Sequence, residues 1–345
     1  MDAFTPDSIH TEDELDELLT RPRPALVAFI RTLSSPLVVL GAGGKMGPTL
    51  AVLARRAAEA AGHALDVVAV SRFSDHAARQ WLEAKGVRTL SLDLLNRDAV
   101  ARLPDSAYVV YLVGLKFGTA SAPADTWAVN TLIPAHVVER YPRAGMVAVS
   151  TGNVYPLVRA PGSGSVETDP LTPLGEYANA AVARERMFEF FARRNGTPLA
   201  ILRLNYAVDL RYGVLIDLAR KVSAREPVDL TMGFFNCIWQ GDANDMILRA
   251  FAFAQSPPRV LNLTGPVLSV REVALRFGQL LGQPTRFTGT EADTALLSNP
   301  ERACTLLGQP STPAERMIRW TADWIEHGGR LLDKPTHFET RDGKY

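Results

Sequence analysis

Three glycines at intervals of three residues could bring the backbone of this chain close to a phosphate group. They are Gly41, Gly44 and Gly47 in the segment GAGGKMG. The first would permit a tight turn, the second would let the backbone approach an anion, and the third would let a following helix pack closely. The N–H groups and the dipole at the start of such a helix attract negative charge. The turn, with Lys45 and Met46 in it, therefore predicts a site for the pyrophosphate of a dinucleotide.

The flanking sequence supplies the strand and the helix that such a turn requires. An apolar run from Leu37 to Leu40 leads into the turn, and a segment rich in Ala and Arg follows it. Further along, short apolar runs alternate with helical segments, which indicates a parallel sheet with helices on both faces. We expect an α/β fold, a Rossmann-type doubly wound parallel sheet with a smaller C-terminal substrate lobe. The expected strands are 36–40, 66–71, 89–92, 108–113, 146–150 and 199–204, and the expected helices between them are 48–61, 77–85, 97–103, 127–141 and 177–194.

The ends of the next strands indicate which dinucleotide the turn would hold. An acidic residue after the second strand would bind the ribose hydroxyl of NAD, but this chain has Ser71 and Arg72 there. A hydroxyl and a guanidinium suit a 2′-phosphate, so we expect NADP, with NAD as the alternative. Asp93, after the third strand, could accept a hydrogen bond from the adenine amino group or could simply cap a loop or helix. Three further residues at strand ends are expected to contact the cofactor: Leu94, Leu112 and Val113.

A second group of motifs follows the fourth strand. The expected strand 146–150 runs into the segment STGNVY at 150–155, and Tyr177 opens a later helix. Together with the glycine spacing, this order resembles the extended short-chain dehydrogenase/reductase family, the NAD(P)-dependent epimerase/dehydratase group. The resemblance covers roughly residues 36–330, and it implies that Asn130 contacts the cofactor. Further segments match the family in order: 167–170, 202–205, 238–242 and 262–265.

The resemblance also implies the chemistry, with one departure. In the family a Tyr exchanges a proton with the substrate hydroxyl, a Ser or Thr orients the substrate oxygen, and a Lys four residues after the Tyr assists. Tyr177 and Thr151 match the first two roles, but Ala181 occupies the position of the Lys. A phenol ionises only near pH ~10 without a nearby cation, so a substitute is needed. One candidate is Arg184, nearly two helical turns after Tyr177, and another is Lys116; each could instead be an ordinary surface or structural side chain.

The pattern loosens after residue 204. Tyr206 and Arg211 could line a substrate pocket, because ligands bind at the carboxyl ends of parallel strands. We expect a strand over 235–239 and a helix that begins with Asp242 as its cap. The polar tail from Lys334 is expected to lie on the surface. The expected parts of the chain are an N-terminal helical extension (1–35), an NAD(P)-binding Rossmann domain (36–204, with 236–265 returning to it), and a substrate-binding lobe with the C-terminal tail (205–235 and 266–345).

The composition argues against several kinds of partner. Lys plus Arg number 37 and Asp plus Glu number 37, so no basic excess exists to neutralise a nucleic acid. No apolar run reaches the ~20 residues that span a bilayer, and the acidic N-terminal segment does not resemble a secretory leader. Cys237 and Cys304 are expected to be reduced, buried thiols of a cytoplasmic protein. The six histidines show no metal-ligand spacing, so we expect no metal site.

These observations lead to one expected function and one alternative. The first is an NAD(P)-dependent oxidoreductase or epimerase that acts on a hydroxyl or carbonyl group of a small polar, sugar-like molecule. The alternative is a protein that has lost the Lys and binds NAD(P) without turning it over, as a sensor or an assembly partner. The resemblance further implies a homodimer, because the family often pairs through a two-helix face.

Overall fold

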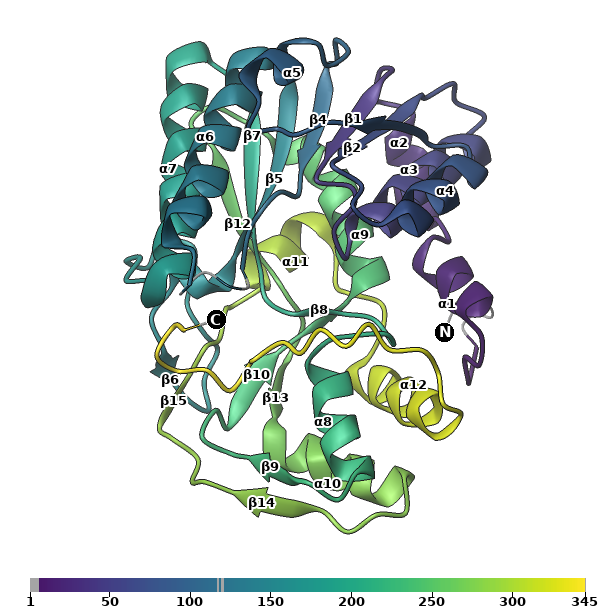
Figure 1. Ribbon diagram of the computed structural model, residues 1–345, viewed down its shortest axis with the longest axis vertical. Coiled ribbons are helices and arrows are strands. Elements are labelled where there is room, and N and C mark those ends of the chain that lie inside the picture. The colour runs from purple at the N-terminus through teal and green to yellow at the C-terminus, as the bar shows by residue number, and fades with distance from the viewer. Residues whose placement is uncertain (1–5, 117, 119–120, 345) are drawn as a thin grey trace.

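The centre of the computed structural model, which describes residues 6–344 apart from 117, 119 and 120, is a seven-stranded sheet (Figure 1). Every neighbouring pair of its strands is parallel. The strand order reverses in the middle of the sheet, so the predicted doubly wound, Rossmann-type fold is confirmed. In spatial order the strands are β12 (Arg259–Leu263), β7 (Leu199–Leu204), β5 (Gly145–Thr151), β4 (Tyr108–Tyr111), β1 (Leu37–Leu40), β2 (Val67–Ser71) and β3 (Arg88–Ser91).

Helices cover both faces of the sheet, so each central strand buries side chains on both sides. Leu37 and Val39 of β1 belong to one hydrophobic core, whereas Val38 and Leu40 belong to the other. This alternation is the two-residue period of a strand, and it explains why the run is continuously apolar. One layer comprises α2 (Pro24–Ile30), α3 (Gly47–Ala60), α4 (His76–Ala84) and α9 (Gln240–Arg249), and the other comprises α5 (Arg97–Ala101), α6 (Pro123–Arg140) and α7 (Gly175–Asn195).

A second lobe follows β7 and has its own hydrophobic core. The N-terminal helix α1 (Glu12–Leu19) packs into this core through Leu15 and Leu19, whereas α2 packs on the sheet. The main elements of the lobe are β8 (Ala207–Val208), α8 (Val214–Ser223), β9 (Pro227–Asp229), β10 (Phe234–Asn236), β11 (Ile238–Trp239), β13 (Val267–Ser269), α10 (Val270–Leu280), β14 (Arg286–Thr288) and α12 (Ala314–Glu326). Of the shorter elements, β6 (Val158–Arg159) and β15 (Thr294–Ala295) pack with this lobe, whereas η2 (Ala250–Phe253) and α11 (Glu301–Leu307) pack into the core of the sheet, and η1 (Gly152–Val154) follows β5.

Two local predictions after residue 204 were wrong. The expected strand 235–239 is divided into β10 and β11, which pair with different strands. Asp242 does not cap a helix, because α9 begins at Gln240 and Asp242 is fully buried in its first turn. Its carboxylate instead pairs with Arg23 and accepts a hydrogen bond from the backbone N–H of Thr312 at 2.9 Å. These partners are remote in sequence, so no local pattern could reveal them.

The C-terminal tail is not the surface segment that its polar composition predicted. Figure 1 shows the tail running from α12 across the middle of the molecule, between the sheet and the second lobe. Thr336 and Phe338 are buried. The backbone N–H and the hydroxyl of Thr336 both donate to one carboxylate oxygen of Asp217, at 2.8 and 2.6 Å. The tail is therefore packed into the interface between the two halves.

Both cysteines are buried free thiols, as predicted. Burial raises the pKa of Cys237 to about 12, so its thiol stays protonated and unreactive at neutral pH. None of the helices in the described part of the chain combines the length and the apolar content that crossing a membrane requires.

Candidate active site

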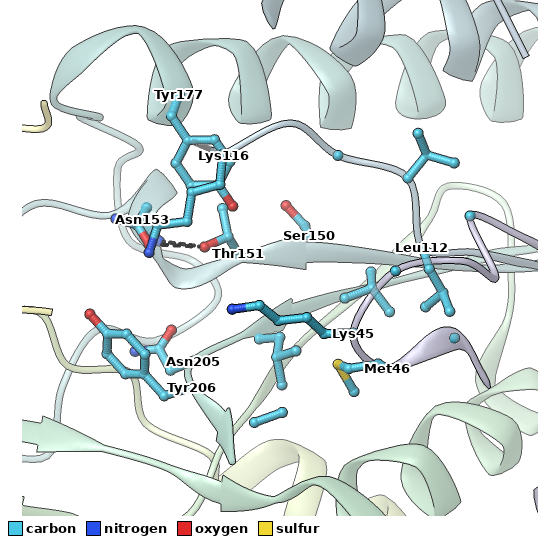
Figure 2. Close-up of a pocket in the computed structure, with 18 of the residues that line it drawn as sticks. Lys45, Met46, Leu112, Lys116, Ser150, Thr151, Asn153, Tyr177, Asn205 and Tyr206 are labelled. Atoms are coloured by element: carbon cyan, nitrogen blue, oxygen red, sulfur yellow. Dashed lines mark hydrogen bonds between the residues drawn. The ribbon is translucent and has the colours of Figure 1, made fainter. Parts of the chain in front are cut away.

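A pocket of about 290 Å³ lies at the carboxyl ends of the central strands, where the sheet meets the second lobe (Figure 2). Ligands of doubly wound sheets bind at this edge, beside the point where the strand order reverses. The pocket collects most of the predicted site residues. Those that line it are Gly41, Gly44, Lys45, Met46, Gly47, Leu112, Val113, Lys116, Thr151, Tyr177 and Arg184.

The glycine turn has the geometry that the spacing predicted. Gly41 has a φ of +81°, a conformation that favours glycine. A Cβ on Gly47 would lie only 2.5 Å from the Cα of Ala42, so α3 can begin against the turn only with glycine there. A Cβ on Gly44 would lie 3.3 Å from a backbone oxygen of the turn. No side chain caps the N-terminus of α3, which leaves its first N–H groups at the pocket wall for an anion.

Two hydroxyl groups lie on the opposite wall. Thr151 ends β5, and Tyr177 lies in the first turn of α7. Figure 2 shows both side chains directed into the same cavity. The hydroxyl of Thr151 donates to the Asn153 side-chain oxygen at 3.0 Å and accepts from the Asn153 N–H at 3.2 Å. Asn153 therefore fixes the orientation of the threonine hydroxyl.

Position 181 has no room for the charge that the family places there. Ala181 is fully buried in an apolar cluster with Val154. One turn further along α7, Arg184 is also buried, and its Nη1 donates to the backbone oxygen of Val113 and to the Asn130 side chain, both at 3.0 Å. Within the described residues, Arg184 has no carboxylate at ion-pair distance. The pocket wall therefore holds a guanidinium whose charge is not neutralised by a protein anion.

A buried network of polar side chains, centred on Glu185 and Arg203, lies next to the part of the pocket wall formed by Arg184. Glu185 forms an ion pair with Arg203 at 2.7 Å and accepts a hydrogen bond from the Ser150 hydroxyl at 2.5 Å. Arg203 also donates to the Tyr155 hydroxyl at 2.7 Å, and that hydroxyl donates to Asn262 at 2.8 Å. Burial raises the pKa of Tyr155 to about 12. Tyr155 is therefore held in this network, whereas Tyr177 lines the pocket itself.

Five predicted cofactor residues lie outside the pocket. Ser71 packs beside the glycine turn, where a Cβ on Gly43 would lie 2.6 Å from its hydroxyl oxygen. Arg72 and Asp93 are exposed after β2 and β3, and Asp93 accepts a hydrogen bond from the Leu95 N–H at 2.9 Å. The remaining two do not line the pocket: Leu94 is buried in a hydrophobic core, and Asn130 is fully buried where its side-chain oxygen accepts a hydrogen bond from Arg184, so their contacts with a cofactor stay predictions.

Sequence reasoning missed several lining residues. Tyr206 lines the pocket as expected, with a φ of +39° that is unusual for a tyrosine. Arg211 does not line it, because it forms ion pairs with Asp209 and Asp16. Asn205 could have been found from its place directly after β7, whereas Leu296 comes from a remote segment with no local signal. The missed lining residues include Asn153, Asn205, Tyr212 and Leu296.

The fold also brings together histidines whose spacing suggested nothing. His10 and His327 stack with ring centroids 4.4 Å apart, and each lies beside the carboxylate of Asp323. One ligand atom from each of the three lies within 4.8 Å of the others. The cluster joins the N-terminal segment to the end of α12, at the surface. The contacts that join the three side chains are the stacking of the two rings and the approach of each ring to the Asp323 carboxylate.

The fold and the pocket define a class of nucleotide-binding α/β protein, and the comparison with known families makes the assignment specific. The model of the NAD dependent epimerase/dehydratase family matches residues 37–228, which is more than half of the chain. The chain belongs to this family, as the glycine turn and the motifs at 150–155 and 177 implied. A search of the curated proteins finds no significant match.

Solved structures of several sugar-nucleotide enzymes share the fold. MoeE5, solved with UDP-glucose and NAD, is 23% identical with a TM-score of 0.68, and the match covers 86% of this chain and 99% of that one. The dTDP-glucose 4,6-dehydratase of Bacillus anthracis, solved with NAD, is 16% identical with a TM-score of 0.70, covering 85% and 97%. The UDP-glucose 4-epimerase of Thermus thermophilus, also with NAD, is 20% identical with a TM-score of 0.67, covering 85% and 99%.

Proposed function

We propose that this chain is an NAD(P)-dependent oxidoreductase or epimerase acting on a hydroxyl or carbonyl group of a small polar, sugar-like substrate. The observation that carries the proposal is the convergence of the glycine turn, Thr151 and Tyr177 on one pocket. The backbone N–H groups of the turn can bind a pyrophosphate. The Tyr177 hydroxyl can transfer a proton, and the Thr151 hydroxyl can orient the substrate oxygen. When bound, a nicotinamide cofactor supplies the hydride acceptor or donor. Membership of the family adds support.

The residues present fit such a cofactor. The uncapped start of α3 offers N–H groups to two phosphates, and the missing Cβ atoms at Gly44 and Gly47 let the backbone come close. Leu112 and Val113 supply an apolar wall at the end of β4. These contacts require neither a metal nor a basic side chain on the turn.

The proton chemistry is assigned to two side chains of this chain. The Tyr177 phenolic oxygen accepts the proton of the substrate hydroxyl during oxidation and returns it during reduction. The Thr151 hydroxyl, held by Asn153, hydrogen bonds to the same substrate oxygen and fixes its direction. Arg184 takes over the electrostatic role of the absent Lys, because a buried positive charge in the pocket wall stabilises negative charge that develops on the phenolic oxygen.

A substrate screen separates this function from the alternative of binding without turnover. MoeE5 was solved with UDP-glucose, which supports nucleotide sugars as the first members of the panel, followed by simple sugars and hydroxy acids. The protein is incubated with each compound and with NAD or NADP, and products are followed by nicotinamide absorbance, which reports net oxidation or reduction, and by chromatography that separates epimers of equal mass. Conversion supports the enzyme. Cofactor binding without conversion across the panel supports the sensor.

We extend the proposal to NADP rather than NAD as the cofactor, because Arg72 follows β2 and no acidic residue stands there. Arg72→Ala is expected to weaken NADPH binding by about 10- to 100-fold, the usual contribution of a hydrogen bond to a charged group, and to leave NADH binding unchanged. Titration calorimetry with both cofactors measures the effect. Arg143→Ala, an exposed arginine beside the opposite end of β5, is the control. If Arg72→Ala weakens NADPH and NADH binding equally, Arg72 does not bind the 2′-phosphate.

The homodimer also remains a proposal. Large apolar side chains are exposed on α6 and α7, the helix pair on the outer face of one layer, and a two-helix interface would bury them. They are Trp127, Leu132 and Phe190.

A further inference from the structure

Two histidines and one aspartate gather where the N-terminal segment meets the end of α12. Asp323 and His327 are four residues apart at the end of α12, so they lie on the same face of that helix. His10 comes from the segment that precedes α1, and its ring stacks on that of His327. None of the three lines the pocket described above, so the proposed chemistry does not use them.

The donor atoms of these side chains are as close together as the ligands of a metal ion. Nε2 of His10 lies 3.1 Å from one carboxylate oxygen of Asp323, and Nδ1 of His327 lies 3.3 Å from the other. One donor atom from each of the three residues lies within 4.8 Å of the others. Zinc bonds of about 2.0–2.1 Å place neighbouring ligands of a tetrahedral site about 3.3 Å apart. The spacing therefore suits an ion of this size.

The aspartate has an oxygen whose hydrogen-bonding capacity is not used. Oδ2 of Asp323 is buried and accepts no hydrogen bond within the described part of the chain. The approach of His10 Nε2 to 3.1 Å is short, but it does not form a hydrogen bond with this oxygen. A buried acceptor without a donor is unfavourable. A nitrogen and an oxygen that lie close together without forming a hydrogen bond are arranged as two ligands of one ion would be.

Both segments are held in place by contacts outside the cluster. Ile9, next to His10, is fully buried in the core of the second lobe. The His10 N–H donates to the Glu14 carboxylate at 2.8 Å, and the Trp320 side chain of α12 donates to the backbone oxygen of Pro6 at 3.1 Å. Because the ligands are already positioned, little conformational entropy is lost when they bind an ion.

The chemistry of the donors favours a transition metal. Imidazole nitrogen is a typical ligand of zinc, whereas magnesium and calcium prefer oxygen ligands. The Asp323 carboxylate supplies a negative charge, and His327 is the C-cap of α12, where the helix dipole adds partial negative charge. Nδ1 of His327 also lies 2.8 Å from the Asp323 backbone oxygen, and binding an ion through this nitrogen replaces that hydrogen bond.

We propose that His10, Asp323 and His327 bind a divalent transition metal ion, with Zn²⁺ as the ion that fits the donor set. Both imidazoles are about half exposed, with 49% of each side chain accessible, so solvent completes the coordination. Two ligands belong to α12 and the third to the N-terminal segment. The ion therefore fastens this segment to the second lobe, a structural role that is independent of the proposed function.

The test is calorimetric titration of ZnCl₂ into the full chain, prepared without a polyhistidine tag and freed of metal with a chelator. We expect saturable binding of Zn²⁺ and no binding of MgCl₂ under the same conditions. His10→Ala, His327→Ala and Asp323→Asn should each weaken Zn²⁺ binding by about tenfold or more. His76→Ala, which removes an exposed histidine from the start of α4, should bind Zn²⁺ like the original chain.

A second readout on the original chain identifies the ligands without relying on the folding of a variant. X-ray absorption at the zinc edge of the loaded protein should show imidazole nitrogens at about 2.0–2.1 Å. Zn²⁺ should also raise the melting temperature of the original chain and of His76→Ala, and it should leave that of His10→Ala unchanged.

Three outcomes overturn the inference. They are the absence of Zn²⁺ binding to the original chain, equal affinity of the original chain and the three ligand variants, and a zinc-edge spectrum without imidazole ligands. Each of them leaves the proposed function intact, because nicotinamide binding and turnover are measured separately and at a different site.

Discussion

Tyr177→Phe is expected to lower kcat by about 10²- to 10⁴-fold while cofactor affinity stays within twofold, because it removes only the phenolic oxygen that we propose exchanges the proton. The ring remains to fill its nearly buried site, so the fold is retained. The measurement is steady-state turnover of the substrate found in the screen, with cofactor affinity determined by calorimetry on the same preparation.

A second tyrosine provides the matched control. Tyr141 is buried, and its hydroxyl donates to the backbone oxygen of Pro104 at 2.8 Å, away from the pocket. Tyr141→Phe removes an equivalent hydroxyl and should leave kcat unchanged. If Tyr177→Phe retains full kcat at an unchanged melting temperature, Tyr177 is not the acid/base, and the mechanism proposed here is wrong.

Breaking the ion pair between Glu185 and Arg203 is expected to give the largest loss of stability. Both side chains are about 5% exposed, and each single change leaves the partner as an uncompensated buried charge. Glu185→Gln and Arg203→Met should each lower the free energy of unfolding by about 3–5 kcal/mol. Urea denaturation followed by circular dichroism measures the loss.

The double variant shows whether the loss comes from the pair. Glu185→Gln combined with Arg203→Met leaves no charge in the site, so its loss should be clearly smaller than the sum of the two single losses. Strictly additive losses would mean that the two charges act independently. Arg193→Met, which removes an exposed pair with Glu189, should cost less than about 1 kcal/mol.

Local patterns were sufficient to predict the sheet and the turn. The strands of the centre are buried on both faces, so their runs of Val, Leu and Ala are continuous and easy to recognise. The turn is encoded by steric requirements at single positions, such as the contact of Gly47 with Ala42, which only glycine satisfies. Thr151 and Tyr177 follow from their places at a strand end and a helix start.

Contacts between distant segments account for the rest. The residues around Asp242 do not predict that it pairs with Arg23. Likewise, the sequence of the tail does not predict that Thr336 hydrogen bonds to Asp217. Asn130 is a further example. The resemblance identified the residue, but the sequence does not show that Arg184 would donate a hydrogen bond to its side chain.

We propose that the backbone amides at the start of α3 hold the pyrophosphate of a nicotinamide dinucleotide. Calorimetric titration of NADH and NADPH into the folded protein tests it most directly, with Gly47→Ala as the disrupted variant and Gly145→Ala, whose Cβ would make an ordinary 3.5 Å contact, as the control. We predict saturable binding of at least one cofactor to the original chain and to the control, and loss of binding in Gly47→Ala. If neither cofactor binds to the original chain, the claim is contradicted.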